Sequence, residues 1–375
     1  MIHYRLVFVF VFVFALVALG AEISAQDGWQ SAVRGREFVF PRDHSAHPES
    51  KTEWWYFVGH LDSEDGSERL GFQFTLFRQG LRPPGSPSGS SRFLVSDFHF
   101  GHLAISDLKK ARHWGHQRVL RGSFGEAGTG QPGEEQLVWV GDWSVDRVGE
   151  KGFRIRGSEG ELALDLELTP TKPIVLQGDR GYSPKAAGKG NASNYYSQTR
   201  LSAKGSVAWP GRSAEVRGDA WLDREWSTSM LGADQAGWDW FALQFEDGTE
   251  LMIYQMRKRD GTADPFSSGT FVDQEGRSTR LMAGDFTLRP LRDWTSAKSG
   301  GQYPVKWEVK VPGRQLSLEV EAAFDEQEMA LGIVNYWEGS VGVKGTHSGR
   351  GYLEMTGYAG DLVGLRGLPE SKNQP

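Results

Sequence analysis

Two distant segments of the chain carry the same pattern, and this repeat constrains the fold more than any other feature. Residues 52–78 open with an aromatic run, reach a Glu-Asp-Gly turn at 64–66 and continue into a second apolar run. Residues 238–257 do the same, with Glu-Asp-Gly at 246–248. An aromatic strand, an Asp-Gly turn and a second apolar strand are typical of a β-hairpin. The chain therefore contains two copies of one aromatic hairpin.

The motifs that follow each hairpin also come in the same order. Tyr195–Ser197 in the first half corresponds to Tyr336–Glu338 in the second, and Gly218–Trp221 corresponds to Gly349–Tyr352. Several matches in one order favour an internal duplication of a β-domain over a chance match between aromatic-rich strands. A duplicated β-sheet domain has an interior or a seam in which a ligand can bind.

The composition agrees with strands. The chain holds 14 Trp, 21 Phe and 48 Gly, and aromatic residues favour strands while glycines favour turns. Residues 161–168 and 316–322 alternate apolar and polar side chains, as half-buried strands do. No long stretch has a helical period. We therefore predict an all-β, antiparallel fold.

The first residues are typical of a cleaved secretory signal, which we assign to residues 1–25. Arg5 precedes an uninterrupted apolar run from Leu6 to Leu19, and small residues follow. Cleavage after Ala21 or Ala25 fits this pattern. The run is short for a membrane-spanning helix, although an uncleaved N-terminal anchor is the alternative. We expect a periplasmic or secreted protein.

Cysteine content and charge exclude several classes of function. The chain has no cysteine, which excludes disulfides and thiol catalysis. Its net charge is −6, and removal of the signal takes away one cation, Arg5, and one anion, Glu22, so that the charge stays the same. This mild acidity gives no reason to expect nucleic-acid binding.

About 350 residues remain after cleavage, enough for two domains. We place an N-terminal domain at 37–230 and a C-terminal domain at 237–366, joined by a bridge of small residues around 229–236. Three loops stand out by composition. Residues 82–91 are rich in Pro, Gly and Ser, whereas 125–135 and 179–193 are rich in Gly and serve either as lids or, as we favour, as loose connections.

Two elements are specific enough to carry a resemblance: Glu-Trp-Trp-Tyr at 53–56 and Asp-Arg-Glu-Trp at 223–226. With them, the sequence resembles the AttH/CrtC-like family over nearly the whole mature chain. The matching segments are 40–48, 52–61, 195–197, 218–227, 237–241, 336–339 and 351–358.

The resemblance implies two lipocalin-like barrel domains packed together. The family includes carotenoid 1,2-hydratase and related hydratases and cyclases. Many bacterial members are labelled predicted secreted hydrolases and sit beside transporter components. Members usually carry His at the position of Arg224. Arginine stays charged, so an acid–base role for that His does not carry over.

Four carboxyl groups are candidate catalytic residues: Glu225, Asp239, Asp223 and Glu53. On a strand, Asp223 and Glu225 point to one face and Arg224 to the other. A carboxyl among aromatic rings is desolvated, which raises its pKa and lets it act as a general acid. Protonation of an alkene gives a carbocation, which aromatic faces stabilise before water adds.

Buried ion pairs that fix the packing of the domains are the alternative for these carboxylates, and we weigh it more heavily. The candidate ligand-binding residues surround them in the aromatic motifs. They are Trp54, Trp55, Tyr56, Tyr196, Arg224, Trp226, Trp238, Trp240 and Tyr254.

Metal and hydrolase motifs find little support. Three His-x-x-His pairs start at His44, His99 and His113, but on strands this spacing sends the two rings to opposite faces. There is no Gly-x-Ser-x-Gly motif and no metal motif, although a triad scattered in sequence stays open. We expect no metal and no cofactor.

The sequence thus predicts an exported protein that binds a hydrophobic small molecule or lipid, with or without hydrating or isomerising it. The alternatives are an accessory component of a cell-envelope ABC transporter and a hydrolase of unknown substrate. Whether the barrels are hollow stays open, because eight-stranded barrels hold one small ligand or none.

Overall fold

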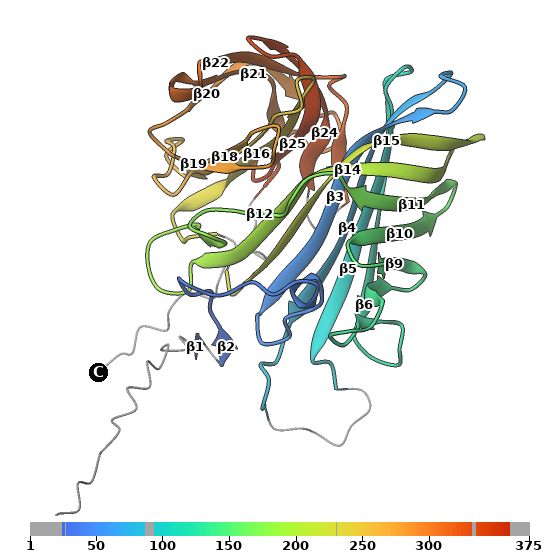
Figure 1. Ribbon diagram of the computed structural model, residues 1–375, viewed down its shortest axis with the longest axis vertical. Coiled ribbons are helices and arrows are strands. Elements are labelled where there is room, and N and C mark those ends of the chain that lie inside the picture. Colours follow the sequence, from blue (N-terminus) through green and yellow to red (C-terminus); the bar gives the residue numbers. More distant parts are fainter. Residues whose placement is uncertain (1–24, 27, 87–93, 230, 332–334, 361–375) are drawn as a thin grey trace, which may run out of the picture.

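The computed structural model describes residues 25–26, 28–86, 94–229, 231–331 and 335–360, and these ranges are almost entirely antiparallel β-strands. Two large sheets, one of 13 strands and one of 10, make up the protein (Figure 1). The other regular elements described are a short β1–β2 pair and two 3-10 turns. The predicted all-β class is confirmed.

The first sheet comprises β3 (Thr52–Ser63), β4 (Arg69–Gly80), β5 (Asp97–Asp107), β6 (Arg112–Arg121), β7 (Ala127–Thr129), β8 (Gln136–Val140), β9 (Trp143–Val148), β10 (Gly152–Glu159), β11 (Leu162–Pro170), β12 (Val175–Leu176), β13 (Tyr182–Pro184), β14 (Ala192–Trp209) and β15 (Arg212–Ser227). The second comprises β16 (Gln235–Phe245), β17 (Glu250–Lys258), β18 (Ser268–Val272), β19 (Ser278–Met282), β20 (Thr287–Thr295), β21 (Gln302–Val311), β22 (Leu316–Ala322), β23 (Glu328–Ala330), β24 (Asn335–Gly345) and β25 (Gly349–Met355). The small elements are β1 (Ala25–Gln26), β2 (Trp29–Gln30), η1 (Arg42–His44) and η2 (Pro312–Arg314).

Nine strands of the first sheet have counterparts in the same order in the second. The first runs β6-β5-β4-β3-β15-β14-β11-β10-β9 and the second runs β19-β18-β17-β16-β25-β24-β22-β21-β20. The hairpin β3–β4 thus corresponds to β16–β17, and β15 to β25. In each half the last strand returns to pair with the first, which curls the sheet toward a barrel. The internal duplication predicted from the sequence is confirmed by this topology.

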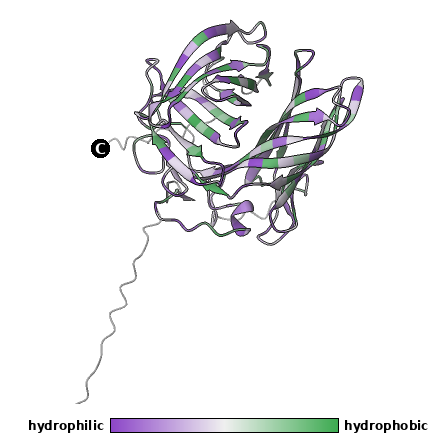
Figure 2. Ribbon diagram, turned by 45° about the horizontal axis from the view of Figure 1, so that its top comes forward, coloured by the Kyte–Doolittle hydropathy of each residue, from purple (hydrophilic) through white to green (hydrophobic). Residues whose placement is uncertain are grey.

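Alternating side chains explain why each sheet curls around a core. In β11, Leu162, Leu164, Leu166 and Leu168 are buried while Asp165 and Glu167 lie at the surface. The same alternation of hydrophobic and hydrophilic positions is visible along many strands (Figure 2). Burial of one face therefore fixes the register of each strand.

Large side chains fill the interiors of both barrel-like sheets. In the first, Trp55, Phe74 and Trp143 are fully buried, and the glycine at 157 lies so close to Phe74 that an added Cβ would come within 2.7 Å of it. Fully buried aromatic residues, among them Trp307 and Trp337, fill the second interior in the same way. Space for a ligand is found instead at the seam between the two sheets.

The seam is formed by the outer faces of the hairpin strands and their partners. A separate apolar cluster lies there, with Tyr56 and Trp221 from the first sheet and Trp240 and Tyr352 from the second. Hydrogen bonds cross it, including one between His60 Nε2 and Ser340 Oγ at 2.7 Å. The seam is therefore a packed interface with polar contacts.

Some predicted features lie outside the described residues. The signal segment 1–25 lies there except for Ala25, and so does the 87–91 part of the 82–91 loop. Residues 125–135 include β7, and 179–193 include β13. In the part of the chain described, no helix is long and apolar enough to cross a membrane. The domain boundaries stay a prediction, although the chain passes from one sheet to the other between β15 and β16.

Candidate active site between the two sheets

A small pocket of about 100 Å³ lies in the seam. Its wall combines aromatic rings with three carboxyl groups and one ammonium group. The lining residues are Trp54, Tyr56, Phe77, Lys185, Tyr195, Asp223, Glu225, Trp238, Trp240, Tyr254, Met256 and Glu354. An apolar pocket with a few convergent polar groups is the usual form of a small-molecule site.

Equivalent positions of the two repeats face each other across this pocket. Asp223 of β15 lies opposite Tyr56 of β3, and Glu354 of β25 lies opposite Trp240 of β16. The pairings Trp54 with Phe77 and Trp238 with Met256 extend the same correspondence. The pocket is therefore a product of the duplication, with a carboxyl group and a set of apolar side chains from each half.

The carboxyl group of Asp223 is held by three hydrogen-bond donors. Its carboxyl accepts hydrogen bonds from Tyr195 Oη at 2.5 Å, Ser197 Oγ at 2.5 Å and Trp221 Nε1 at 2.7 Å. Burial raises the pKa of Asp223 to about 7, although these three donors lower it, and the charge of Glu225 adds to the rise. The raised pKa favours the protonated form of this carboxyl more than is usual for an aspartate.

Glu225 and Lys185 form the ion pair of the pocket. Lys185 Nζ lies 3.1 Å from Glu225 Oε1, and it also lies over the rings of Tyr195 and Tyr254 at 4.8 and 4.4 Å. The pKa of Lys185 is raised, because attraction by Glu225 outweighs burial, which lowers it. Oε1 of Glu225, the oxygen that faces Lys185, is buried and makes no hydrogen bond of good geometry. The ion pair with Lys185 is therefore its one close polar contact among the described residues.

Glu354 completes the acidic wall. Burial raises its pKa to about 8, a side-chain hydrogen bond from Trp238 lowers it, and the charges of Asp223 and Glu225 raise it further. Directly opposite on β24 lies Glu338, which accepts a hydrogen bond from Tyr56 Oη at 2.5 Å. Burial and the neighbouring Glu354 raise the pKa of Glu338 well above its usual range. Glu354 is thus a carboxylic acid at neutral pH, and the pocket side of its strand leaves it partly accessible.

The structure brings many of the predicted residues to this pocket. Asp223 and Glu225 lie there, together with a set of predicted ligand-binding side chains. That set is Trp54, Tyr56, Trp238, Trp240 and Tyr254.

The remaining predicted residues lie on the interior faces of the sheets. Glu53 accepts hydrogen bonds from Arg78 Nε and Arg224 Nη2, each at 2.5 Å, and these cations hold its pKa well below the usual range against the effect of burial. Arg224 stacks on Trp55 at 3.7 Å. Trp226 stacks on the ring of His47 at 3.8 Å. Arg224, in the position of the family His, therefore belongs to a buried ion cluster rather than to the pocket.

Two more predicted residues are turned away from the pocket. Tyr196 lies in the first sheet's interior, where its hydroxyl is 2.6 Å from His44 Nδ1. Asp239 lies 3.0 Å from Arg257 Nε and accepts a hydrogen bond from Tyr358 Oη at 3.0 Å. Burial raises the pKa of Asp239 to about 6, but strand alternation points it to the opposite face from Trp238 and Trp240.

Sequence reasoning missed Glu354, Lys185 and Tyr195 as site residues. A signal for Glu354 was present, because aligning Gly218–Trp221 with Gly349–Tyr352 places Glu354 at the position of Asp223. No comparable signal pointed to Lys185, which comes from the 179–193 loop and follows β13. That loop contributes a wall of the site.

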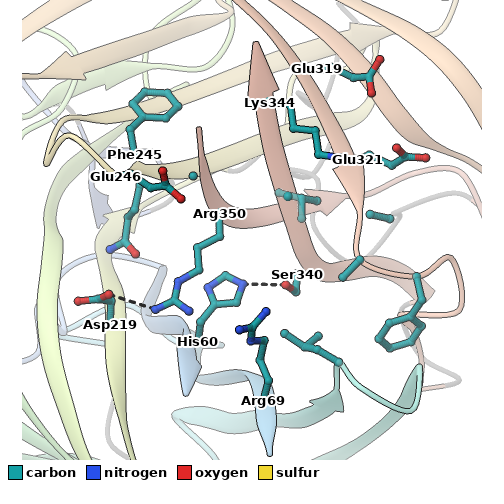
Figure 3. Close-up of a pocket in the computed structure, with 18 of the residues that line it drawn as sticks. His60, Arg69, Asp219, Phe245, Glu246, Glu319, Glu321, Ser340, Lys344 and Arg350 are labelled. Carbon is teal, nitrogen blue, oxygen red and sulfur yellow. Dashed lines mark hydrogen bonds and ion pairs between the residues drawn. The ribbon is translucent and has the colours of Figure 1, made fainter. Parts of the chain in front are cut away.

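A wider cleft of about 910 Å³ lies elsewhere along the seam (Figure 3). It is lined mainly by charged side chains that are already paired, such as Arg350, which donates to Asp219 at 3.1 Å. Burial, and then Arg350 and Arg69, lower the pKa of His60 to about 3, so this ring is neutral. Because His60 is neutral and much of the charge in this cleft is paired, the small pocket with its raised carboxyl pKa values is the better candidate.

Among the described residues, no group of three or more His, Asp or Glu side chains could hold a metal ion. The expectation that no metal or cofactor is needed stays a prediction.

The fold and the site define a class: a two-domain, lipocalin-like β-protein with an acidic, aromatic pocket between its repeats. The family model described as AttH-like matches residues 31–358, and the chain belongs to this family.

Solved structures agree. A protein assigned as AttH from Nitrosomonas europaea is 33% identical, with a TM-score of 0.78 over 87% of this chain and 98% of that chain. Kievitone hydratase from Nectria haematococca is 16% identical, with a TM-score of 0.64 over 89% of this chain and 97% of that chain, and it shares the fold. No curated protein matches the sequence.

Proposed function

We propose that the protein binds a hydrophobic small molecule in the interdomain pocket and hydrates or isomerises one of its carbon–carbon double bonds. The observation that carries the proposal is the convergence of carboxyl groups with pKa values of about 7 and 8, Asp223 and Glu354, on an aromatic pocket. A general acid works best when its pKa lies near the working pH.

Glu354 is the better acid of the two. Asp223 already accepts three hydrogen bonds, which hold its carboxyl in place, whereas Glu354 is partly accessible. In the proposed step, the proton of Glu354 forms a C–H bond at one alkene carbon, and the π electrons leave a cation at the other. The faces of Trp54 and Trp240 stabilise that cation.

Water then closes the reaction. Its oxygen bonds to the cationic carbon, and its proton passes to Glu225, the carboxylate beside Lys185. Transfer of that proton back to Glu354 restores the site. Loss of a proton from a neighbouring carbon to Glu225, in place of water addition, gives isomerisation.

One further observation supports the proposal. Kievitone hydratase, whose name describes a hydratase, has the same fold. Export through residues 1–25 stays a prediction. A carrier is the second candidate, favoured by the small size of the pocket and by the three donors that already hold Asp223. A partnership with an envelope ABC transporter or a hydrolase activity stays a prediction.

The test is to incubate the protein with envelope lipids and apolar alkenes, and to extract and weigh what is bound and what is released. A released product heavier by one water, at many turnovers per chain, is expected. Glu354→Gln and Glu225→Gln should lower turnover by about a hundredfold to ten-thousandfold. Asp219→Asn is the matched control, because Asp219 lies on the same strand as Glu225 but in the wide cleft. Recovery of an unchanged ligand at one per chain would contradict the enzymatic function and support a carrier function.

A further inference from the structure

The pocket is too small to hold a whole drug-sized ligand. Its volume is about 100 Å³, whereas such ligands occupy pockets of about 300–1,000 Å³. A larger molecule bound with its reacting end among the carboxyl groups must therefore extend past the pocket wall. The question is where the structure offers an apolar surface that continues that wall.

A row of apolar side chains leaves the pocket across the outer face of the first sheet. Trp54 on β3 lies opposite Phe77 on β4, Phe77 lies opposite Phe100 on β5, and Phe100 lies opposite Val119 on β6. Directly opposite residues share one face of a sheet. These four residues, which we term the apolar row, therefore form one line from the pocket to the edge strand.

The rings of the apolar row touch and are open to solvent. The centroids of Phe77 and Phe100 are 4.3 Å apart and their planes differ by 9°, so the rings stack. Trp54 and Phe77 line the pocket itself. Phe100 is half-buried and Val119 is 46% exposed. The row thus continues the pocket wall without a break.

The two sides of the row differ. On one side, His102 of β5 lies opposite Gln117 of β6, and its ring packs edge-on against Phe77 while Tyr336 Oη lies 2.7 Å from its Nδ1. On the other side, the half-buried ring of Phe98 lies 6.0 Å from that of Phe100, so the apolar surface widens there before Arg121. The three strand spacings from β3 to β6 add up to about 14 Å. The apolar row, widened by Phe98 on one side, is therefore about as long as a dodecyl chain.

We propose that the apolar row binds the extended hydrocarbon tail of the ligand whose reacting end lies in the interdomain pocket. The inference rests on the proposed function and extends its site: the reacting end of the ligand lies in the pocket and its apolar tail lies along the row. Contacts between the row and the tail increase the affinity for the ligand, while the carboxyl groups of the pocket contact only its reacting end.

The test measures affinity and turnover against tail length. Trisubstituted alkenes with hexyl, dodecyl or octadecyl tails are presented in mixed micelles, and binding is followed by quenching of tryptophan fluorescence. In the wild type, Kd should fall at least about tenfold from the hexyl to the dodecyl probe and change little beyond it, because the row ends at β6. In Phe100→Ser/Val119→Ser, the gain should shrink to under about threefold, with circular dichroism confirming that the variant is folded.

A matched control is offered by the duplication. Met282 on β19 is 49% exposed and occupies the edge strand that corresponds to β6, so Met282→Ser should keep the tail-length dependence of the wild type. An equal dependence on tail length in the wild type and the double variant would overturn the inference. So would self-association of the wild type that the double variant loses, since a second copy would then cover the row.

The outcomes separate the two proposals. Binding that depends on tail length but gives no product would support the apolar row as a tail site and contradict the proposed reaction. Turnover that does not depend on tail length would support the proposed reaction and contradict the proposed tail site.

Discussion

The acidic side chains on the two faces of β3 and β15 have different surroundings. On the interior face, Glu53 lies between Arg78 and Arg224, and all three side chains are buried. On the outer face, Asp223 and Glu225 share the pocket with Glu354, and Lys185 is the one cation on its wall. Neighbouring residues of the same two strands thus enter either a charged cluster or a proton-holding pocket.

The difference lies in the number of cations for each carboxyl group. Two guanidinium groups for one carboxylate hold the pKa of Glu53 low in spite of burial. One ammonium for three carboxyl groups leaves desolvation uncompensated, which raises the pKa of Asp223 and Glu354 to about 7 and 8. Burial alone therefore does not predict whether an acid in this fold is structural or chemical.

The largest expected effect comes from breaking the interior cluster. Arg224→Met leaves Glu53 with one guanidinium group, that of Arg78, and loss of one partner of a buried ion pair costs about 3–5 kcal/mol of unfolding free energy. Urea denaturation at neutral pH measures the change. Glu53→Gln/Arg224→Met removes both charges and should recover part of the loss. A single variant within about 1 kcal/mol of the wild type would mean that the cluster is not structural.

The outer face should give stability the opposite dependence on pH. Asp223 and Glu354 have ordinary pKa values of 3.8 and 4.5 and raised folded values of about 7 and 8. Their contribution is therefore full below about pH 4 and is lost as the pH rises through 7 and 8. The slope is at most about 1.4 kcal/mol per pH unit for each group.

Denaturation of the wild type and of Asp223→Asn at pH 5, 6, 7 and 8 tests this dependence. The free energy of unfolding should decline with pH in the wild type and decline less in the variant. Glu53 behaves in the opposite sense, because its folded pKa is lowered and its contribution disappears as the pH falls below its ordinary value. Equal slopes in the two proteins would show that Asp223 is ionised throughout.

A smaller change is expected from Lys185→Met. Lys185 lowers the pKa of Glu354, so its removal raises that pKa and moves the alkaline limit of turnover to higher pH, by about one unit. A pH–rate profile measures the shift. Lys189→Met, on an exposed position of the same loop, is the control that should leave the profile in place. A move to lower pH would contradict the assignment of Glu354 as the acid.

The smallest effect is expected at the surface. Arg69 lies 3.4 Å from Asp62, and both side chains are exposed. Arg69→Gln should change the unfolding free energy by less than about 1 kcal/mol, because exposed ion pairs contribute little. Thermal denaturation in low and high salt measures it. A loss as large as that of Arg224→Met would remove the contrast between exposed and buried pairs.

The contribution of the sequence is clearest for the fold. The repeated hairpins predicted the duplication, and strand alternation predicted that Asp223 and Glu225 share a face opposite Arg224. Both follow from local periodicity, which a sequence displays directly. The same alternation placed Trp54 and Tyr56 on the pocket side of β3, although sequence reasoning grouped them with Trp55.

The sequence predicted only part of the site, because the other part lies in a different repeat. Glu354 lies more than a hundred residues after Glu225 in the chain, and Lys185 lies in a loop between two strands. Only the packing of the sheets brings both beside Glu225. Sequence alone also left Asp239 as a candidate acid. The strand register turns it toward Arg257, on the far side of the wall.

By itself, then, the sequence determined the strands, their alternation and the doubling of the domain, because these depend on neighbouring residues. Only the tertiary structure decided which acids meet cations and which meet aromatic rings and one another. That distinction depends on distances between side chains from separate strands, and it sets the pKa of each group. For this protein, it separates the ion cluster inside one sheet from the candidate active site between two.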